Sequence, residues 1–318
     1  MKYLRLFDEH SQYESFTGTD AFLKPNVSHC IEENEVHYNP MHNYVEDYLT
    51  FVALESGTFT FTPNNNNIIS YSIDNGTTWT EGNTVSVNNG DKVLWKGTMT
   101  PSSSYPQGIG TFSSTAEFDV QGNAMSLLFG GDFKGQTSLT GKNYAFYNLF
   151  NGNTKVVNAE NLSLPATILS SQCYNIMFNR CTALTTAPVL PATTLADNCY
   201  SSMFVNCTSL VAAPELPATT LTNNCYRSMF YNCSSLTTAP VLPATTLADS
   251  CYREMFYNCT SLNYIKAMFT TTPSTSYTRN WVNGVAATGT FVKNSAATWT
   301  TTGIHAVPTG WTVETASS

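Results

Sequence analysis

Histidine and cysteine side chains near the start of the chain are the first candidates for chemistry. His29, Cys30, His37 and His42 lie close together in the sequence, and part of this group would share one predicted hairpin. Both residue types bind zinc, but this spacing matches no zinc motif, and spacing is what makes such motifs specific. We therefore expect ordinary hairpin side chains at these positions, with no metal and no cofactor.

Eight further cysteines form two series that each step by 26 residues: Cys173, Cys199, Cys225 and Cys251, and Cys181, Cys207, Cys233 and Cys259. A catalytic thiol or hydroxyl needs a polarising histidine, and the only histidine beyond residue 42 is His305. Even spacing instead favours buried thiols that fill space between stacked segments. Disulfides stay open as an alternative, because the chain has nine cysteines.

Paired carboxylates could cleave glycosidic bonds. The candidates, one or two in each 26-residue unit, are Glu215, Glu254, Asp197 and Asp249. This scatter favours solvated turn residues, and the equivalent positions Asp197, Asn223 and Asp249 are predicted to be helix N-caps. We therefore expect no catalytic residues, and a glycan-degrading enzyme is the weaker alternative.

Tyrosines recurring in register are the better functional candidates. Tyr231 and Tyr257 are one pair, and they are expected to face outward; a second series is Tyr200, Tyr226 and Tyr252. Tyrosine rings with Thr, Ser and Asn around them can bind sugars by stacking and hydrogen bonding. The competing interpretation, favoured for the second series, is that a tyrosine beside a cysteine packs against the neighbouring unit.

The element that must position these residues is a 26-residue repeat. Leu-Pro-Ala-Thr begins at Leu164, Leu190, Leu216 and Leu242, and Met-Phe recurs with the same step. A 26-residue unit cannot cover its own apolar side, so the units must stack. Each unit is predicted to hold a short helical turn around Cys199–Cys207, followed by a short strand over 210–216 that its prolines limit.

This unit resembles the BspA-type leucine-rich repeat, whose usual form is Ala-Phe-x-x-Cys-x-x-Leu, a strand and Ile-Pro. The matching residues here are Met203-Phe204, Cys207, Leu210 and Leu216-Pro217, over roughly residues 144–312. The resemblance implies a leucine-rich-repeat solenoid with interaction or adhesion roles on surfaces of gut Bacteroidetes and in their crAss-like phages. It implies no catalytic residues, and the differing Tyr and Thr positions leave the ligand unassigned.

The flanking segments are expected to cap the stack. Leu149-Phe150 resembles Met-Phe, without the cysteines and with about two residues added. Beyond residue 269 a compact aromatic cap of short strands is predicted around Trp281, Phe291, Trp299 and Trp311.

Residues 46–140 are predicted to form an immunoglobulin-like antiparallel β-sandwich. Apolar residues alternate in about seven short runs, including Leu49 to Phe51, Val93 to Trp95 and a last run over 125–129. Turn sequences such as Asp74-Asn75-Gly76 separate the runs. We expect this domain to space and orient the stack.

Residues 1–45 resemble an N-terminal module of virion proteins from phages that infect gut Bacteroidetes. The resemblance is carried by Pro25-Asn26-Val27-Ser28 and Val36-His37-Tyr38-Asn39-Pro40. A strand at 3–7, a short helix at 8–16 and a hairpin within 27–38 are predicted. The resemblance implies docking onto a capsid or tail, for which the candidate residues are Tyr3, Phe7, Asn26, Val36, His37 and Tyr38.

Composition narrows the class of protein. Charged residues make up only 11% of the 318 residues, as on β-rich surfaces, and the net charge of −8 argues against nucleic-acid binding. We find no signal-peptide pattern and no long apolar run, so membrane insertion is not expected. The sequence thus predicts a mainly β, non-enzymatic virion surface protein: a head fibre, capsid decoration or tail-associated adhesin.

The predicted organisation is 1–45 for docking, 46–140 for the sandwich, 141–269 for the solenoid and 270–318 for the cap. Expected partners are other virion proteins at the N-terminal module and a host glycan or protein at the solenoid, with homo-oligomers left open. A bacterial cell-surface adhesin of the BspA-like type is the main alternative, and a purely structural decoration is another.

Overall fold

The computed structural model describes the backbone of residues 3–7, 12–16, 31–32 and 35–36, and all of residues 47–316. These residues are mainly β, with two short helices among them, as the sequence predicts. The chain forms two compact units, 1–43 and 44–318, and each is described by itself. Within the described residues, no helix has the length and apolar character needed to cross a bilayer.

The first unit contains two antiparallel strand pairs. β1 (Tyr3–Phe7) pairs with β2 (Gln12–Phe16), and β3 (Ile31–Glu32) pairs with β4 (Glu35–Val36). The predicted first strand is therefore confirmed, and so is the pairing within the predicted hairpin for 31–32 and 35–36; the other residues of that hairpin lie outside the described residues. The helix predicted over 8–16 is wrong for 12–16, because pairing with β1 satisfies backbone groups that a helix this short holds poorly.

The docking candidates belong to this unit. Tyr3, Phe7 and Val36 lie on β1 and β4, of which only the backbone is described. Outside the described residues lie Asn26, His37 and Tyr38, together with His29, Cys30 and His42, at which no metal is expected. The docking role stays a prediction.

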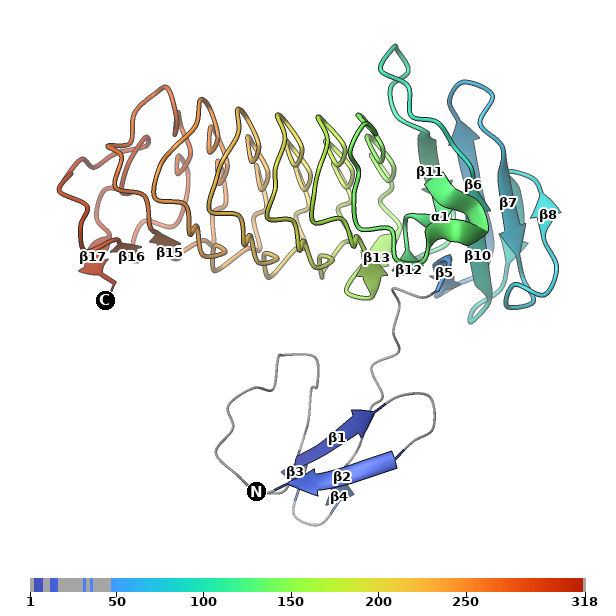
Figure 1. Cartoon of the computed structure of the whole chain (residues 1–318). Helices are drawn as coiled ribbons and strands as arrows, with labels where there is room; N and C mark the ends of the chain where they lie inside the picture. Colours follow the sequence, from blue (N-terminus) through green and yellow to red (C-terminus); the bar gives the residue numbers. More distant parts are fainter. Residues whose placement is uncertain (1–2, 8–11, 17–30, 33–34, 37–46, 317–318) are drawn as a thin grey trace. The chain divides into compact units, whose positions relative to one another are not determined.

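Two β-sheets begin the second unit (Figure 1). One has the order β11-β6-β9, and the other has the order β13-β12-β5-β10-β7-β8 with β14 also paired to β12. The strands are β5 (Leu49–Ala53), β6 (Gly57–Pro63), β7 (Ile69–Ser72), β8 (Thr80–Glu81), β9 (Thr84–Val87), β10 (Lys92–Gly97), β11 (Gly110–Ser114), β12 (Phe118–Asn123), β13 (Val156–Asn158) and β14 (Leu162–Ser163).

Aromatic side chains join these two sheets. The Phe51 ring of β5 lies 5.3 Å from Phe59 of β6 and 4.7 Å from Phe112 of β11, centroid to centroid. The strand predicted over 125–129 is wrong, because the chain turns there into α1 (Ser126–Phe129) and the 3₁₀ helix η1 (Gly130–Phe133). The Ser126 hydroxyl fixes this turn, since it donates to Trp95 O and accepts from Leu49 N.

The sheet continues directly into the repeats. β12 pairs antiparallel with β5 on one side and parallel with β13 and β14 on the other. Gly122 permits this crossing, because φ is +78° and a Cβ there would collide with the Tyr48 carbonyl. One hydrophobic core runs from Leu49 to Trp311, while the predicted domain boundaries inside residues 44–318 stay predictions.

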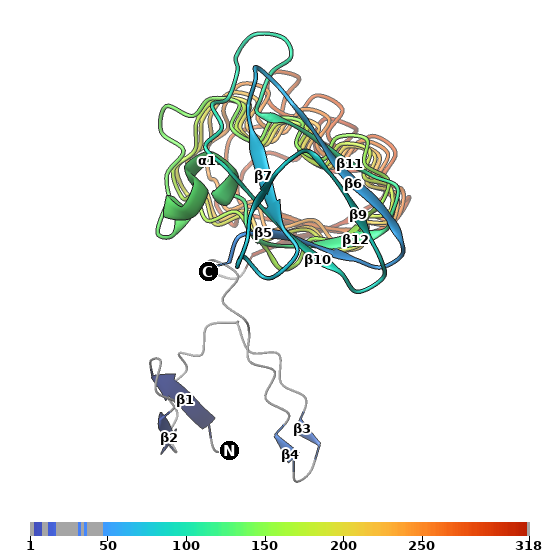
Figure 2. The same cartoon turned by 90° about the vertical axis from the view of Figure 1, so that its right-hand side faces the viewer.

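From residue 144 onward the chain forms stacked coils, which superimpose when seen end-on (Figure 2). Each repeated coil has one segment, here called the turn segment, that runs up to its second cysteine: 172–181, 198–207, 224–233 and 250–259. Even-numbered residues there donate N–H to the next coil, as Tyr200 N does to Cys225 O. Odd-numbered residues donate N–H to the carbonyl oxygen three residues earlier in the same coil, as Met203 N does to Tyr200 O. The two sets together satisfy the N–H groups of the turn segment.

The turn segment is not the predicted short helix. Every fourth residue has a positive φ, as at Asn198 (57°), Ser202 (58°) and Asn206 (60°). This left-handed residue interrupts any helix, and it donates its own N–H sideways to the neighbouring coil, as Asn198 N does to Asn223 O. The result is a period of four residues, which places Cys199, Tyr200, Met203 and Phe204 together on the inside.

The opposite side of each coil is less regular than predicted. The strand expected over 210–216 is reduced to an isolated parallel bridge between Thr186 and Ala212. Pro214 and Pro217 lack the N–H groups that a longer ladder would need.

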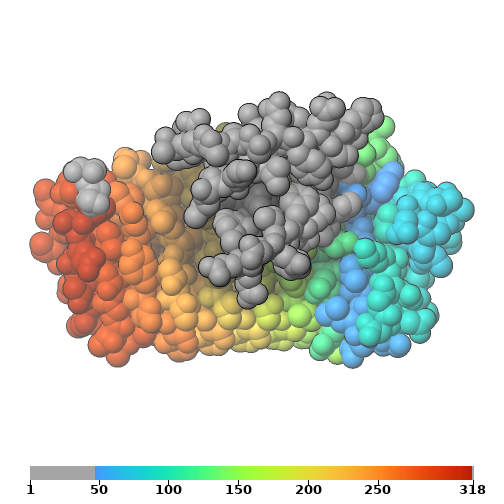
Figure 3. All heavy atoms as spheres, turned by 90° about the horizontal axis from the view of Figure 1, so that it is seen from below, coloured from blue at the N-terminus to red at the C-terminus, as the bar shows by residue number. Residues whose placement is uncertain are grey.

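The ends of the stack follow the predicted pattern. The Phe150 ring stacks on the Phe178 ring, with the centroids 5.1 Å apart and the planes at 12°. These two residues are separated by two residues more than the 26-residue step, as the added residues predict. At the other end three parallel strands form, and Trp281, Phe291, Trp299 and Trp311 are buried beside them. These strands are β15 (Tyr264–Ala267), β16 (Thr290–Lys293) and β17 (Thr312–Thr315). In Figure 3 the colours of this unit follow chain order from blue to red, because each coil contacts its sequence neighbours.

Candidate binding face

The tyrosines beside the first cysteines lie inside the stack. Tyr200 and Tyr226 are 1% exposed and Tyr252 is fully buried. Their rings stack on one another at 5.9 and 6.0 Å, nearly parallel. The interpretation favoured for this series, packing against the neighbouring unit, is therefore confirmed, and the three are wrong as candidate ligand-binding residues, because the four-residue period turns the position after each first cysteine inward.

Removing one of these buried hydroxyls is expected to stabilise the protein. The Tyr226 hydroxyl is buried without a hydrogen-bond partner, and the equivalent position in the first coil is occupied by Phe146. Tyr226→Phe should raise the free energy of unfolding by about 1 kcal/mol, since an unpaired buried hydroxyl costs that much or more. Urea unfolding measures this, with Tyr231→Phe as the control expected to change little. A loss of stability in Tyr226→Phe would show that the hydroxyl has a partner.

The eight described cysteines are structural. All are buried and free, so the disulfide alternative is not realised among them. The second cysteine of each coil donates its thiol to the preceding coil, as Cys207 Sγ does to Phe178 O at 3.1 Å. Burial raises the pKa of every one of these thiols, to about 12 for Cys173 and Cys225. Protonated thiols of this kind are poor nucleophiles.

The predicted outward pair is where the sequence placed it. Tyr231 and Tyr257 are half-buried, and their rings are parallel at 4.7 Å. At this separation no sugar can enter between the two rings, so their edges and hydroxyls are the available groups. Asparagines beside them form a polar ladder, in which Asn232 Nδ2 donates to Asn206 Oδ1 at 2.8 Å.

A column of arginines next to this pair was not identified from the sequence. Arg227, Arg253 and Arg279 occupy equivalent positions in three successive coils, four residues before Tyr231, Tyr257 and Asn283. Their 26-residue step is visible in the sequence, but the last unit lacks the cysteines that mark the others. We call Tyr231, Tyr257 and these three arginines the binding face.

The four candidate carboxylates differ in their surroundings. Asp197, Glu215 and Asp249 are exposed, and Glu254 lies 3.6 Å from Arg253 Nε. The predicted N-cap role is wrong, because no helix follows: Asp197 Oδ1 accepts from Asn223 N of the next coil. Across the described residues, no group of three or more His, Cys, Asp or Glu could hold a metal ion.

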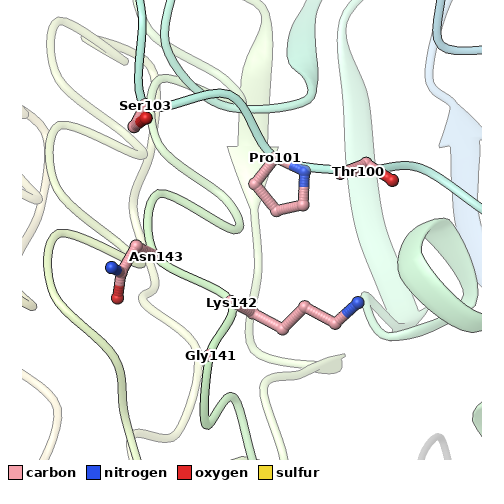
Figure 4. A pocket seen from close by; sticks show the side chains of 6 residues that line it. All are labelled: Thr100, Pro101, Ser103, Gly141, Lys142 and Asn143. Atoms are coloured by element: carbon pink, nitrogen blue, oxygen red, sulfur yellow. The ribbon is translucent and has the colours of Figure 1, made fainter.

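A separate pocket of about 260 Å³ lies between the loop that follows β10 and the start of the first coil (Figure 4). Its lining is polar and comes from Thr100, Pro101, Ser103, Gly141, Lys142 and Asn143. Near the tip of the same loop, Tyr105 is 93% exposed. Lys142 is the one ionisable side chain among these six lining residues.

Comparison of the chain with protein-family models, with curated proteins and with solved structures yields no match. The geometry described above is therefore the basis for any assignment of function.

Proposed function

We propose that this chain is a phage virion protein that displays a BspA-type leucine-rich-repeat solenoid for binding a host or mucosal glycan or protein. It would act as a head fibre, a capsid decoration or a tail-associated adhesin. Residues 1–45 would dock it to other virion proteins, and an immunoglobulin-like sandwich over 46–140 would space the solenoid from the particle.

One observation carries the binding part of this proposal: the inward positions of the turn segments repeat from coil to coil, whereas the outward positions vary. The inward columns, such as Phe178, Phe204 and Phe230, form a continuous stack with ring separations of 5.6 and 5.7 Å. The outward positions vary between coils, as at Asn179, Val205 and Tyr231. A surface that can vary without disturbing its core suits recognition, and many copies on a particle would multiply weak contacts.

The binding part is tested with the full chain on an immobilised mucin surface. Tyr231→Ala/Tyr257→Ala should weaken binding at least about fivefold, because two aromatic contacts are lost. Tyr231→Phe/Tyr257→Phe keeps the rings and shows how much the two hydroxyls contribute to binding. Unchanged binding in the alanine variant would contradict the role of this pair.

The docking part has its own test. A chain lacking residues 1–45 is expected to remain folded and soluble but to be missing from assembled particles, as detected by labelled antibody. If the shortened chain still assembles onto particles, docking through this module is wrong. Antibody labelling of host cells instead of particles would favour the alternative, a bacterial cell-surface adhesin.

A further inference from the structure

We propose that the binding face recognises an acidic polysaccharide, whose carboxylate or sulfate groups pair with the column Arg227, Arg253 and Arg279. This deepens the proposed function and rests on it, because it names the class of glycan that the same face would take.

The three arginines form a closely spaced row. The backbone hydrogen bonds Ser228 N to Arg253 O and Glu254 N to Arg279 O place them at equivalent positions in consecutive coils. In the coils that carry Arg227 and Arg253, stacked rings at equivalent positions are 4.7 to 6.0 Å apart. Consecutive arginines are therefore one coil apart along the backbone, and cationic side chains arranged in this way attract an anionic ligand.

Little in the protein neutralises this row. Glu254 is the one described carboxylate paired with it, at 3.6 Å from Arg253 Nε. That distance is too long for a hydrogen bond, and Arg253 Nε is buried without an acceptor. Arg279 is exposed and Arg227 is half-buried. Guanidinium groups with free donors suit the two-pronged binding of carboxylate or sulfate.

Charge is divided unequally along the chain. Residues 141–318 contain eight Lys or Arg and six Asp or Glu, whereas the whole chain has a net charge of −8. Four of the five arginines lie on this side of the stack. Arg180, Arg227 and Arg253 are in turn segments, and Arg279 is at the equivalent position of the next coil. The stack is therefore the part of this acidic protein that a polyanion can approach.

The neighbouring side chains favour a sugar over a nucleic acid. Beside the arginines stand the tyrosine edges and the amides of Asn206 and Asn232, which can donate to and accept from sugar hydroxyls. The faces of Tyr231 and Tyr257 that meet at 4.7 Å cannot stack on a base, which single-stranded nucleic-acid binding commonly uses.

The test measures binding of the full chain to polygalacturonate, dextran sulfate, neutral dextran and single-stranded oligothymidine. We expect both acidic polysaccharides to bind more tightly than dextran and oligothymidine, with an affinity that falls as salt rises. Arg227→Gln/Arg253→Gln should lose about tenfold or more. Lys92→Gln/Lys266→Gln removes the same charge at two positions on strands, outside the turn segments, and should change affinity less than about twofold. Urea unfolding checks that both variants are folded. The salt dependence of binding is measured on the unaltered chain, so that part of the test does not depend on any variant folding.

Three results would overturn the inference. An equal loss in both double variants would mean that net charge, not the column, attracts the polymers. Oligothymidine binding as tight as polysaccharide binding would assign the row to nucleic acid. Mucin binding that depends on Tyr231 and Tyr257 but not on the arginines would leave the proposed function standing and remove only the acidic class.

Discussion

Raising the pH above 9 is expected to unfold residues 44–318 in one cooperative step. The eight described thiols are buried, and burial raises their pKa from the ordinary value of 9.0, to about 12 for Cys173, Cys225, Cys251 and Cys259. In the unfolded chain the same thiols ionise near pH 9. The thiols should therefore leave the free energy of unfolding unchanged below pH 9 and lower it as the pH rises toward 12.

The size of this effect follows from proton linkage. The folded state retains protons that the unfolded state has lost, so each thiol removes about 1.4 kcal/mol of stability for every pH unit above 9. Eight thiols together remove on the order of 10 kcal/mol for each unit, which is comparable to the whole stability of a typical domain. The buried hydroxyls of Tyr174, Tyr200, Tyr226 and Tyr252, whose pKa is also raised, add to the loss above pH 10.

Urea unfolding at pH 8, 9 and 10 measures the slope, and a thiol reagent reports exposure of the cysteines. Reaction of these thiols should coincide with unfolding, with Cys30→Ser used to remove the cysteine outside the described residues. Cys225→Ala should reduce the slope by about one eighth, since one of eight linked protons is gone. Retention of near-UV circular dichroism at pH 11 together with fully reactive thiols would refute this account.

Removing one complete coil is expected to leave a folded protein. Deletion of residues 199–224 joins Asn198 to Cys225 and so restores the same Asn-Cys junction. Tyr174 would then stack on Tyr226 and Phe178 on Phe230, in place of their present partners at 5.5 and 5.6 Å. The shortened chain should unfold cooperatively at a lower temperature, because one interface between coils is lost.

A deletion out of step with the repeat is the matched control. Removing residues 199–231 leaves the joined coil seven residues short of a full turn. Because an odd number of residues is removed, it also puts residues that bond within a coil where residues that bond between coils should lie. We expect no cooperative thermal transition for this chain. Equal melting of the two shortened proteins would mean that the 26-residue step does not set the packing.

The candidate site was only partly predictable from the sequence. The step of 26 residues placed Tyr231 and Tyr257 together, because equal spacing in stacked units puts equivalent side chains in one column. It did not show that their rings close on each other at 4.7 Å. The arginine column was equally regular, but it extends to Arg279 in a coil that the cysteine pattern does not mark.

The sequence by itself determined the register of the stack and the identity of its inner columns, because a repeat this short can bury its apolar residues only against copies of itself. The tertiary structure decided the local conformation. Hydrogen bonds between coils, such as Phe204 N to Met229 O, stabilise a conformation with a left-handed residue at every fourth position. An isolated segment would lack these bonds and would favour a helix. The bonds between coils thereby turned Tyr200 and its equivalents inward and left the arginine column on the surface.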